Sequence, residues 1–218
     1  MKLHPSIMCA DQGHLETEIK KLTDAGVDYF HVDVMDGAFV PNFGCGAEMI
    51  KCLKKYSATP VDAHLMVQNP ARHIEFFRQL GADMITIHAE ADPHAARTLA
   101  KLKQMGAVPG LAINPGTSIE TVQELLPLCE MVLVMTVNPG FAGQDFLPFT
   151  LGKIKKLCGL TKEHDFSICI DGAMTPEKIR ELNTIGVDAF VLGTQSLFYK
   201  DFNKRDYAAS VRELRGAQ

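Results

Sequence analysis

Two side chains that commonly bind metals or move protons lie in one apolar segment of the sequence. His31 and Asp33 stand two residues apart in the run HVDVMDG, so in a strand both would point to the same face. An imidazole and a carboxylate on a buried face need a partner, which is either a buried His–Asp hydrogen bond or a divalent cation. The predicted strands and helices around His31 and Asp33 decide between the hydrogen bond and the cation.

Eight short apolar segments, rich in β-branched residues, alternate with segments of helical period. Strands are predicted over 3–8, 29–34, 61–66, 84–88, 108–113, 131–137, 167–170 and 189–192, and helices over 14–25, 46–55, 70–80, 92–105, 118–126, 147–158 and 175–185. Strands that are apolar on both faces and alternate with helices predict a parallel sheet covered by helices. A weak repeat of Gly-Val/Ala-Asp, at Gly26, Gly81 and Gly186, precedes three of these strands, as expected where glycine ends a helix.

This pattern predicts a single-domain (β/α)8 barrel over residues 1–218. A doubly wound open sheet is the alternative, but the first strand is not followed by the G-x-G-x-x-G sequence typical of one.

In a barrel of this kind, chemistry takes place at the carboxyl ends of the strands. His31 and Asp33 would reach that end from the second strand, His64 from the third and Asp171 from the seventh. Together they predict a His2Asp2 site for one divalent metal ion: zinc, iron, manganese or cobalt. Asp36 follows Met35 on the other side of the alternation, so we expect it to shape the loop at Gly37. His88, at the end of the fourth strand, is a further polar group to which spacing assigns no role.

Small residues follow the last three strands. The loops contain Asn138–Gln144, Gly172-Ala173 and Gly193-Thr194. Tight turns would explain any one of these loops, but three neighbouring loops of this kind favour a site where backbone N–H groups hold a phosphate ester. Three methionines at strand ends would form a soft floor that excludes water or would simply fill the core; they are Met35, Met66 and Met135.

Composition excludes several classes of function. The 218 residues carry a formal net charge of −4, which offers no basic surface for nucleic acid. The sequence predicts neither a signal peptide nor a membrane-spanning segment, so membrane partners are not expected. The six cysteines are scattered without C-x-x-C spacing, and we expect reduced thiols in a soluble cytoplasmic protein.

The motifs PSI (5–7), HVDVMDG (31–37), FVPN (39–42), HLMV (64–67), VMTVNPGF (134–141) and DG (171–172) resemble the ribulose-phosphate 3-epimerase family in order and along the whole chain. The resemblance implies a metal-dependent barrel enzyme that interconverts D-ribulose 5-phosphate and D-xylulose 5-phosphate, commonly as a homo-oligomer. It assigns His31, Asp33, His64 and Asp171 as metal ligands, with Asp33 and Asp171 also acting as the acid/base pair through a metal-stabilised 2,3-enediolate. The implied substrate-binding residues are Ser6, Met35, His64, Met66, Met135, Gly140, Phe141, Ala142, Gly143, Gly172, Ala173, Gly193 and Thr194.

Several positions depart from the commonest family pattern. Ala142 and Ala173 stand where glycine is usual, Thr194 where serine is usual, Ala38 where histidine is common, and Met8-Cys9 where the family has Leu-Ser. Some of these, with Leu197-Phe198, are similar to the related allulose 6-phosphate 3-epimerases. The epimerisation of D-allulose 6-phosphate to D-fructose 6-phosphate is therefore the alternative activity.

Two other classes of protein share the predicted scaffold. A sugar- or nucleotide-phosphate decarboxylase or aldol synthase would carry an Asp-x-Lys-x-x-Asp arrangement on the third strand, where this chain has Asp62-Ala63-His64 and no lysine. A non-catalytic phosphate-binding barrel, in which His31 and His64 are structural, would bind no metal.

Overall fold

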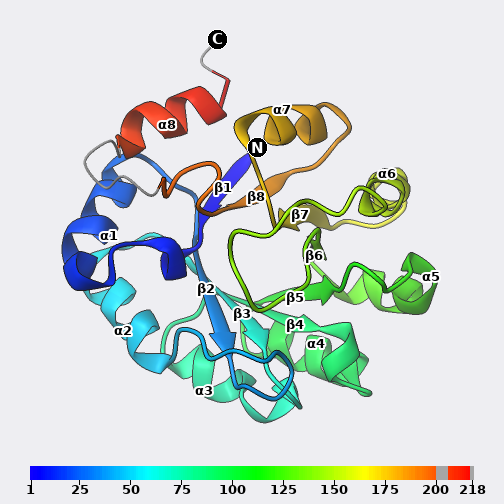
Figure 1. Cartoon of the computed structure of the whole chain (residues 1–218). Helices are drawn as coiled ribbons and strands as arrows, with labels where there is room; N and C mark the ends of the chain where they lie inside the picture. Colours follow the sequence, from blue (N-terminus) through cyan, green and yellow to red (C-terminus); the bar gives the residue numbers. More distant parts are fainter. Residues whose placement is uncertain (200–205, 217–218) are drawn as a thin grey trace.

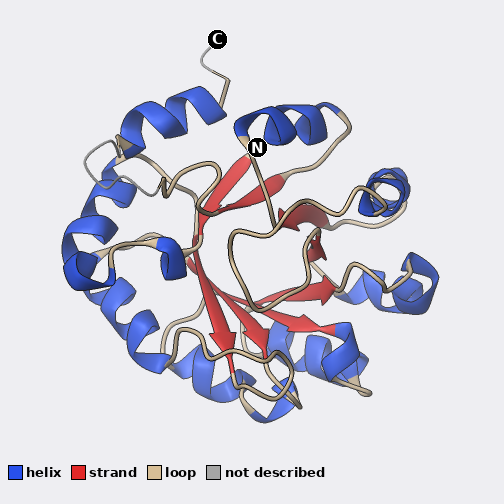
Figure 2. Ribbon diagram, in the orientation of Figure 1, coloured by secondary structure: helices blue, strands red, loops and turns tan. Residues whose placement is uncertain are grey.

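A computed structural model describes residues 1–199 and 206–216 and shows a barrel of eight parallel strands inside a ring of helices (Figures 1 and 2). The predicted (β/α)8 fold is therefore confirmed. The strands are β1 (Lys2–Pro5), β2 (Phe30–Met35), β3 (Val61–Met66), β4 (Met84–His88), β5 (Val108–Ile113), β6 (Met131–Met135), β7 (Ser167–Asp171) and β8 (Ala189–Leu192). The ladder runs in the order β1-β8-β7-β6-β5-β4-β3-β2, and a parallel bridge between Ser6 and His31 joins its two ends.

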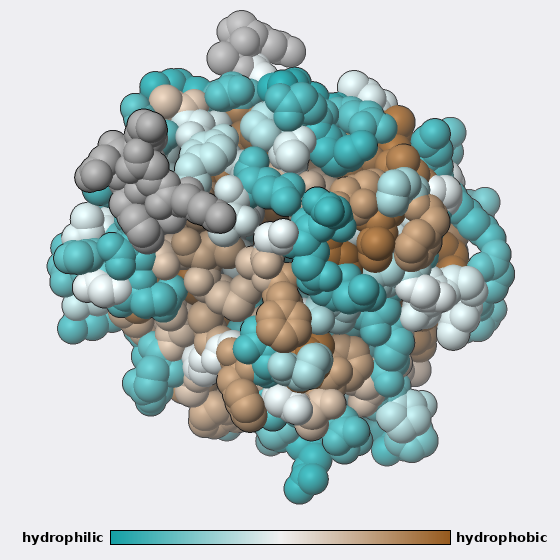
Figure 3. All heavy atoms as spheres, viewed as in Figure 1, coloured by the Kyte–Doolittle hydropathy of each residue, from teal (hydrophilic) through white to brown (hydrophobic). Residues whose placement is uncertain are grey.

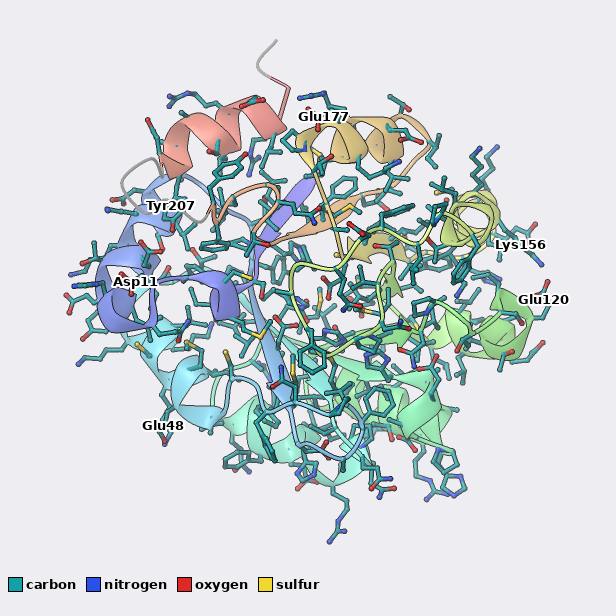
Figure 4. All side chains as sticks on the ribbon, viewed as in Figure 1. Asp11, Glu48, Glu120, Lys156, Glu177 and Tyr207 are labelled. Atoms are coloured by element: carbon teal, nitrogen blue, oxygen red, sulfur yellow. The ribbon has the colours of Figure 1, made fainter. Side chains whose placement is uncertain are left out.

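The helices alternate with the strands and cover the outside of the barrel (Figure 2). They are α1 (Leu15–Asp24), α2 (Ala47–Tyr56), α3 (Ile74–Gln79), α4 (Ala95–Gln104), α5 (Ile119–Val122), α6 (Thr150–Leu160), α7 (Pro176–Thr184) and α8 (Tyr207–Leu214). Charged residues face solvent on this ring, for example Glu120 and Lys156, which form an ion pair between α5 and α6 (Figure 4). None of the helices in the described ranges is long and apolar enough to span a bilayer.

The two faces of the strands have different partners. Outward-facing residues such as Val32, Leu65 and Ile87 are fully buried in the main hydrophobic core, which the helices complete. Inside the barrel, β5 to β8 contribute a second apolar cluster that includes Leu133 and Cys169. The interior of β1 to β4 carries the buried polar side chains instead, which are His4, His31, Asp33, Asp62, His64, Thr86 and His88.

The Gly-Val/Ala-Asp repeat closes the amino-terminal end of the barrel. Its glycines have positive φ values of 79°, 104° and 104° at Gly26, Gly81 and Gly186, a conformation that glycine adopts at little cost. Each aspartate of the repeat then accepts a 2.8 Å hydrogen bond from a backbone N–H at or near the start of a strand; the pairs are Asp28 with Leu3, Asp83 with Val61, and Asp188 with Ile168. These carboxylates are structural and lie at the end opposite the predicted site.

Two predicted strands are shorter in the structure, and one observed helix was not predicted. The strand expected over 3–8 ends at Pro5, and Ile7–Cys9 forms a 3₁₀ turn instead. The strand expected over 131–137 ends at Met135. Helix α8 was not predicted; Asp206 caps it, and the Tyr207 hydroxyl donates a 2.5 Å hydrogen bond to Glu18 of α1 (Tyr207 is labelled in Figure 4). The predicted domain, 1–218, includes 200–205 and 217–218, which lie outside the described residues.

Gly110 on β5 allows a close strand contact inside the barrel. A Cβ atom at this position would lie 2.3 Å from Thr86 Oγ1 and 3.0 Å from Thr86 Cα on the paired strand. We expect Gly110→Ala to lower the free energy of unfolding by about 1–3 kcal/mol because the overpacked strand must shift. Urea unfolding midpoints measure this change.

Gly159→Ala is the matched control, because Gly159 is an exposed helical residue with no atom within 4 Å of its added Cβ. The control should gain about 0.5–1 kcal/mol from the helix propensity of alanine. An unchanged midpoint for Gly110→Ala would contradict this account of the packing.

Candidate functional site

The four predicted metal ligands meet at the carboxyl ends of the strands. The nitrogen and oxygen atoms that His31, Asp33, His64 and Asp171 offer all lie within 4.8 Å of one another. Strand register brings them together, because Asp33 on β2 pairs with His64 on β3. Asp171, the last residue of β7, reaches the cluster from across the barrel.

The spacing of these atoms fits a small divalent cation. His31 Nε2 lies 3.2 Å from His64 Nδ1, 3.4 Å from Asp33 Oδ1 and 3.8 Å from Asp171 Oδ2. His64 Nδ1 lies 3.5 Å from Asp33 Oδ1 and 3.7 Å from Asp171 Oδ2. Ligands about 2.0–2.1 Å from a tetrahedral ion are about 3.4 Å apart, so these two nitrogens and two oxygens form a suitable donor set.

Neighbouring side chains orient two of the four. His31 Nδ1 lies 2.9 Å from Asp62 Oδ2, and the other oxygen of Asp62 accepts a 2.9 Å hydrogen bond from Thr86. Since a carboxylate only accepts, Asp62 keeps the proton of a neutral His31 on Nδ1 and leaves Nε2 free to bind a cation. Ser6 donates a 2.5 Å hydrogen bond to Asp33 Oδ2, so that Oδ1 faces the cluster.

Burial and neighbouring charges push the acidities of the two aspartates apart. Burial alone would raise the pKa of Asp33, but the adjacent His31 and His64 outweigh it and lower that pKa far below its ordinary value. Burial raises the pKa of Asp171 to about 7, and the charge of Asp33 adds to the rise. Two carboxylates in one site, one with a lowered pKa and one with a raised pKa, are typical of acid/base chemistry.

The two histidines also differ in charge. Burial lowers the pKa of His64 to about 4, which keeps its ring neutral. Burial would lower the pKa of His31 as well, but Asp33 and Asp62 on either side raise it well above its ordinary value. A positive charge is therefore strongly favoured between these carboxylates, whether a proton or a metal ion supplies it.

A cavity, partly open to solvent, lies directly above the cluster. Asp33 and Asp171 line it, whereas His31 and His64 are fully buried beneath. Every residue predicted to contact substrate lines the cavity except His64, and Met8, Cys9, Gln144 and Gln195 line it as well. No lysine or arginine belongs to the part of this lining that the structure describes.

Apolar side chains gather around the middle of the face viewed in Figure 3.

Loops that follow β1, β6, β7 and β8 line this cavity. Asn42, in the loop after β2, donates a 2.7 Å hydrogen bond to the carbonyl oxygen of Gly140, which links that loop to the one after β6. Asp36 accepts hydrogen bonds from the backbone of Ala38, Phe39 and Gln68, so it shapes its loop as expected. Gly172 and Ala173 both have positive φ, 118° and 54°. An alanine in this conformation is strained, which explains why glycine suits position 173.

Sequence reasoning missed three polar residues around the cluster: His4, Asp62 and Glu90. Asp62 lies two residues before His64, so strand alternation could have placed it on the same inner face. His4 is buried, lies 3.8 Å from Asp62, and has no hydrogen-bond partner for either ring nitrogen among the described residues. Glu90 lies in a turn after β4 and accepts from His88, a contact for which the sequence holds no local signal.

Comparison with known proteins identifies close relatives over the whole chain. The pattern of the "Ribulose-phosphate 3 epimerase family" matches residues 2–198. The ribulose-phosphate 3-epimerase of Methanocaldococcus jannaschii is 41% identical over 100% of this chain and 91% of its own length. The ribulose-phosphate 3-epimerase of Synechocystis sp. is 37% identical over 98% of this chain and 93% of its own length. A solved structure of a 3-hexulose-6-phosphate synthase shares the fold, with a TM-score of 0.66 and 19% sequence identity. The match covers 100% of this chain and 99% of that one.

The raised pKa of Asp171 predicts how the stability of metal-free protein depends on pH. An aspartate whose pKa is about 7 when folded and about 3.9 when unfolded stabilises the fold fully below pH 3.9 and loses that effect as pH rises through 7. Between pH 6 and pH 8, the free energy of unfolding should therefore fall by about 1.4 kcal/mol more in the chelator-treated wild type than in Asp171→Asn.

Urea unfolding at the two pH values measures this difference. Asp24→Asn, at an exposed position on α1, should keep the wild-type pH dependence. Equal pH dependence in the wild type and Asp171→Asn would contradict the raised pKa.

Proposed function

Because the chain belongs to the ribulose-phosphate 3-epimerase family and is thus an isomerase of carbohydrate phosphates, we propose that it interconverts D-ribulose 5-phosphate and D-xylulose 5-phosphate. The observation that carries the proposal is the pair of carboxylates, Asp33 and Asp171, which face one cavity from β2 and β7 with opposite pKa shifts. A cytoplasmic location and a homo-oligomer stay predictions of this proposal.

Epimerisation at a carbon next to a ketone removes a proton from one face and returns one to the other. Asp33, whose pKa is lowered, is ionised and acts as the base toward C3. Asp171, whose pKa burial raises in the metal-free protein, faces the same cavity and delivers a proton to the opposite face. For the reverse reaction the two carboxylates exchange roles.

We propose that His31, Asp33, His64 and Asp171 hold one divalent ion, whose chemistry when bound is Lewis-acid stabilisation of negative charge on the substrate oxygens. The donor set and the 3.2–3.8 Å spacing support this assignment. Iron, zinc, manganese and cobalt all suit two imidazoles and two carboxylates.

The rest of the cavity would bind the planar intermediate and the phosphate. Met35, Met66 and Met135 line it and offer polarisable thioethers that carry no proton to divert the reaction. The small residues at 140, 142–143, 172–173 and 193 let the backbone approach a phosphate, and backbone N–H groups would hold it because no cationic side chain is found in the described lining.

A second candidate substrate is D-allulose 6-phosphate. Five positions that depart from the commonest family pattern all line the cavity, which is where substrate selection takes place; they are Met8, Cys9, Ala142, Ala173 and Thr194. The two substrates share the reacting C2 and C3 atoms, so the same two carboxylates would serve both.

Proton NMR in D2O tests the proposal directly, with each ketose phosphate supplied separately. We expect deuterium at C3 during turnover and a kcat/KM at least about tenfold higher for ribulose 5-phosphate, because the extra carbon of allulose 6-phosphate must fit between the reacting carbons and the phosphate site. Asp171→Asn should lower the rate of exchange at C3 by at least about 100-fold because the amide cannot donate or accept the proton. Asp24→Asn, remote from the cavity, should exchange like the wild type.

Near-normal exchange in Asp171→Asn would contradict the role of Asp171. A higher kcat/KM for allulose 6-phosphate would overturn the ribulose 5-phosphate assignment and leave the mechanism intact.

A further inference from the structure

Each histidine of the cluster is connected to a carboxylate on the side that faces away from the cavity. For His31 the connection is direct, through the 2.9 Å contact between Nδ1 and Asp62. For His64 it passes through a second ring: His64 Nε2 lies 2.8 Å from His88 Nε2, and His88 Nδ1 lies 3.3 Å from Glu90 Oε2. His88 is completely buried and packs against Phe39, with ring centroids 4.8 Å apart.

Glu90 is itself held in place. Its Oε1 accepts a 2.8 Å hydrogen bond from the backbone N–H of Asn114 and another from the Thr117 hydroxyl, which leaves Oε2 to face His88. Burial would raise the pKa of Glu90, but hydrogen bonds from His88 and Thr117 lower it well below its ordinary value. Glu90 is therefore a carboxylate, and a carboxylate only accepts hydrogen bonds.

This acceptor determines the position of every proton along the chain of rings. Facing Oε2, a neutral His88 must carry its proton on Nδ1, which leaves Nε2 as an acceptor. His64 must then carry its proton on Nε2 in order to donate to His88. Its Nδ1 is left with a free lone pair, and this is the atom that faces His31, Asp33 and Asp171.

We propose that His88 and Glu90 are positioning residues that fix the tautomer and orientation of His64, so that its Nδ1 lone pair points at the centre of the four-residue cluster. The inference rests on the proposed metal site and deepens it, because partners of this kind strengthen a histidine ligand. Neither residue lines the cavity above the cluster, so neither is assigned contact with substrate.

Glu90→Gln tests the proposal with little change in shape. Two donors, from Asn114 and Thr117, meet the Oε1 position, so the amide oxygen should take that place and the NH2 should face His88 Nδ1. His88 must then carry its proton on Nε2, opposite the protonated Nε2 of zinc-bound His64 at 2.8 Å. Two donors facing each other should raise the zinc dissociation constant about 10–100-fold.

Competition with a chromophoric chelator measures zinc affinity in the full-length protein. Thr117→Val is the matched control, because it removes the other side-chain hydrogen bond to Glu90 and leaves the His88 contact in place. We expect its zinc dissociation constant to rise by less than about threefold. Equal zinc affinity in Glu90→Gln and Thr117→Val would overturn the proposal.

Long-range 1H–15N NMR of the histidine rings in the zinc-loaded wild type provides a test that needs no variant. The proposal predicts a proton on Nδ1 of His88, and a proton on Nε2 would overturn it. A wild-type protein that binds no zinc would contradict the proposed metal site, and the His88 tautomer in that zinc-free protein would then still decide the role of Glu90.

Discussion

The burial of several carboxylates around His31 is the constraint on which the rest of the site depends. Asp33, Asp62 and Asp171 all lie within 3.8 Å of a His31 ring nitrogen, and no lysine or arginine is present in the described lining of the cavity above them. Buried negative charge is costly unless a positive charge compensates it. The proposed divalent cation, bound by the two histidines and two of the aspartates, would meet that need and would also make the site reactive.

The barrel makes this arrangement possible because it separates the two faces of each strand. Outward residues build the apolar core with the helices, and inward residues are free to be polar on β1 to β4. Parallel register then sets neighbours at one level, such as His31 beside Asp62 and Asp33 beside His64. The apolar interior of β5 to β8 lowers the local polarity, which strengthens the electrostatic interactions in the polar half.

Local patterns in the sequence predicted the barrel and the meeting of His31, Asp33, His64 and Asp171, because strand alternation and the shared carboxyl end of parallel strands are general rules. The hydrogen-bond partners were not predicted. His31 forms its short hydrogen bond with Asp62, and Asp33 lies farther from its ring. The partner of His31 therefore depends on the register between β2 and β3. The contact of Glu90 with His88 and Thr117 depends on loop conformation, which spacing in the sequence does not define.

The metal content of the protein, purified without chelator and measured by mass spectrometry of the digested sample, tests the central claim most directly. The account predicts about one divalent ion per chain in the wild type and less than about a tenth of that in His64→Ala, with an unchanged circular dichroism spectrum as evidence that the variant is folded. A wild type that takes up no divalent ion even when iron, zinc, manganese and cobalt are supplied, or a folded His64→Ala that retains the full amount, would contradict it.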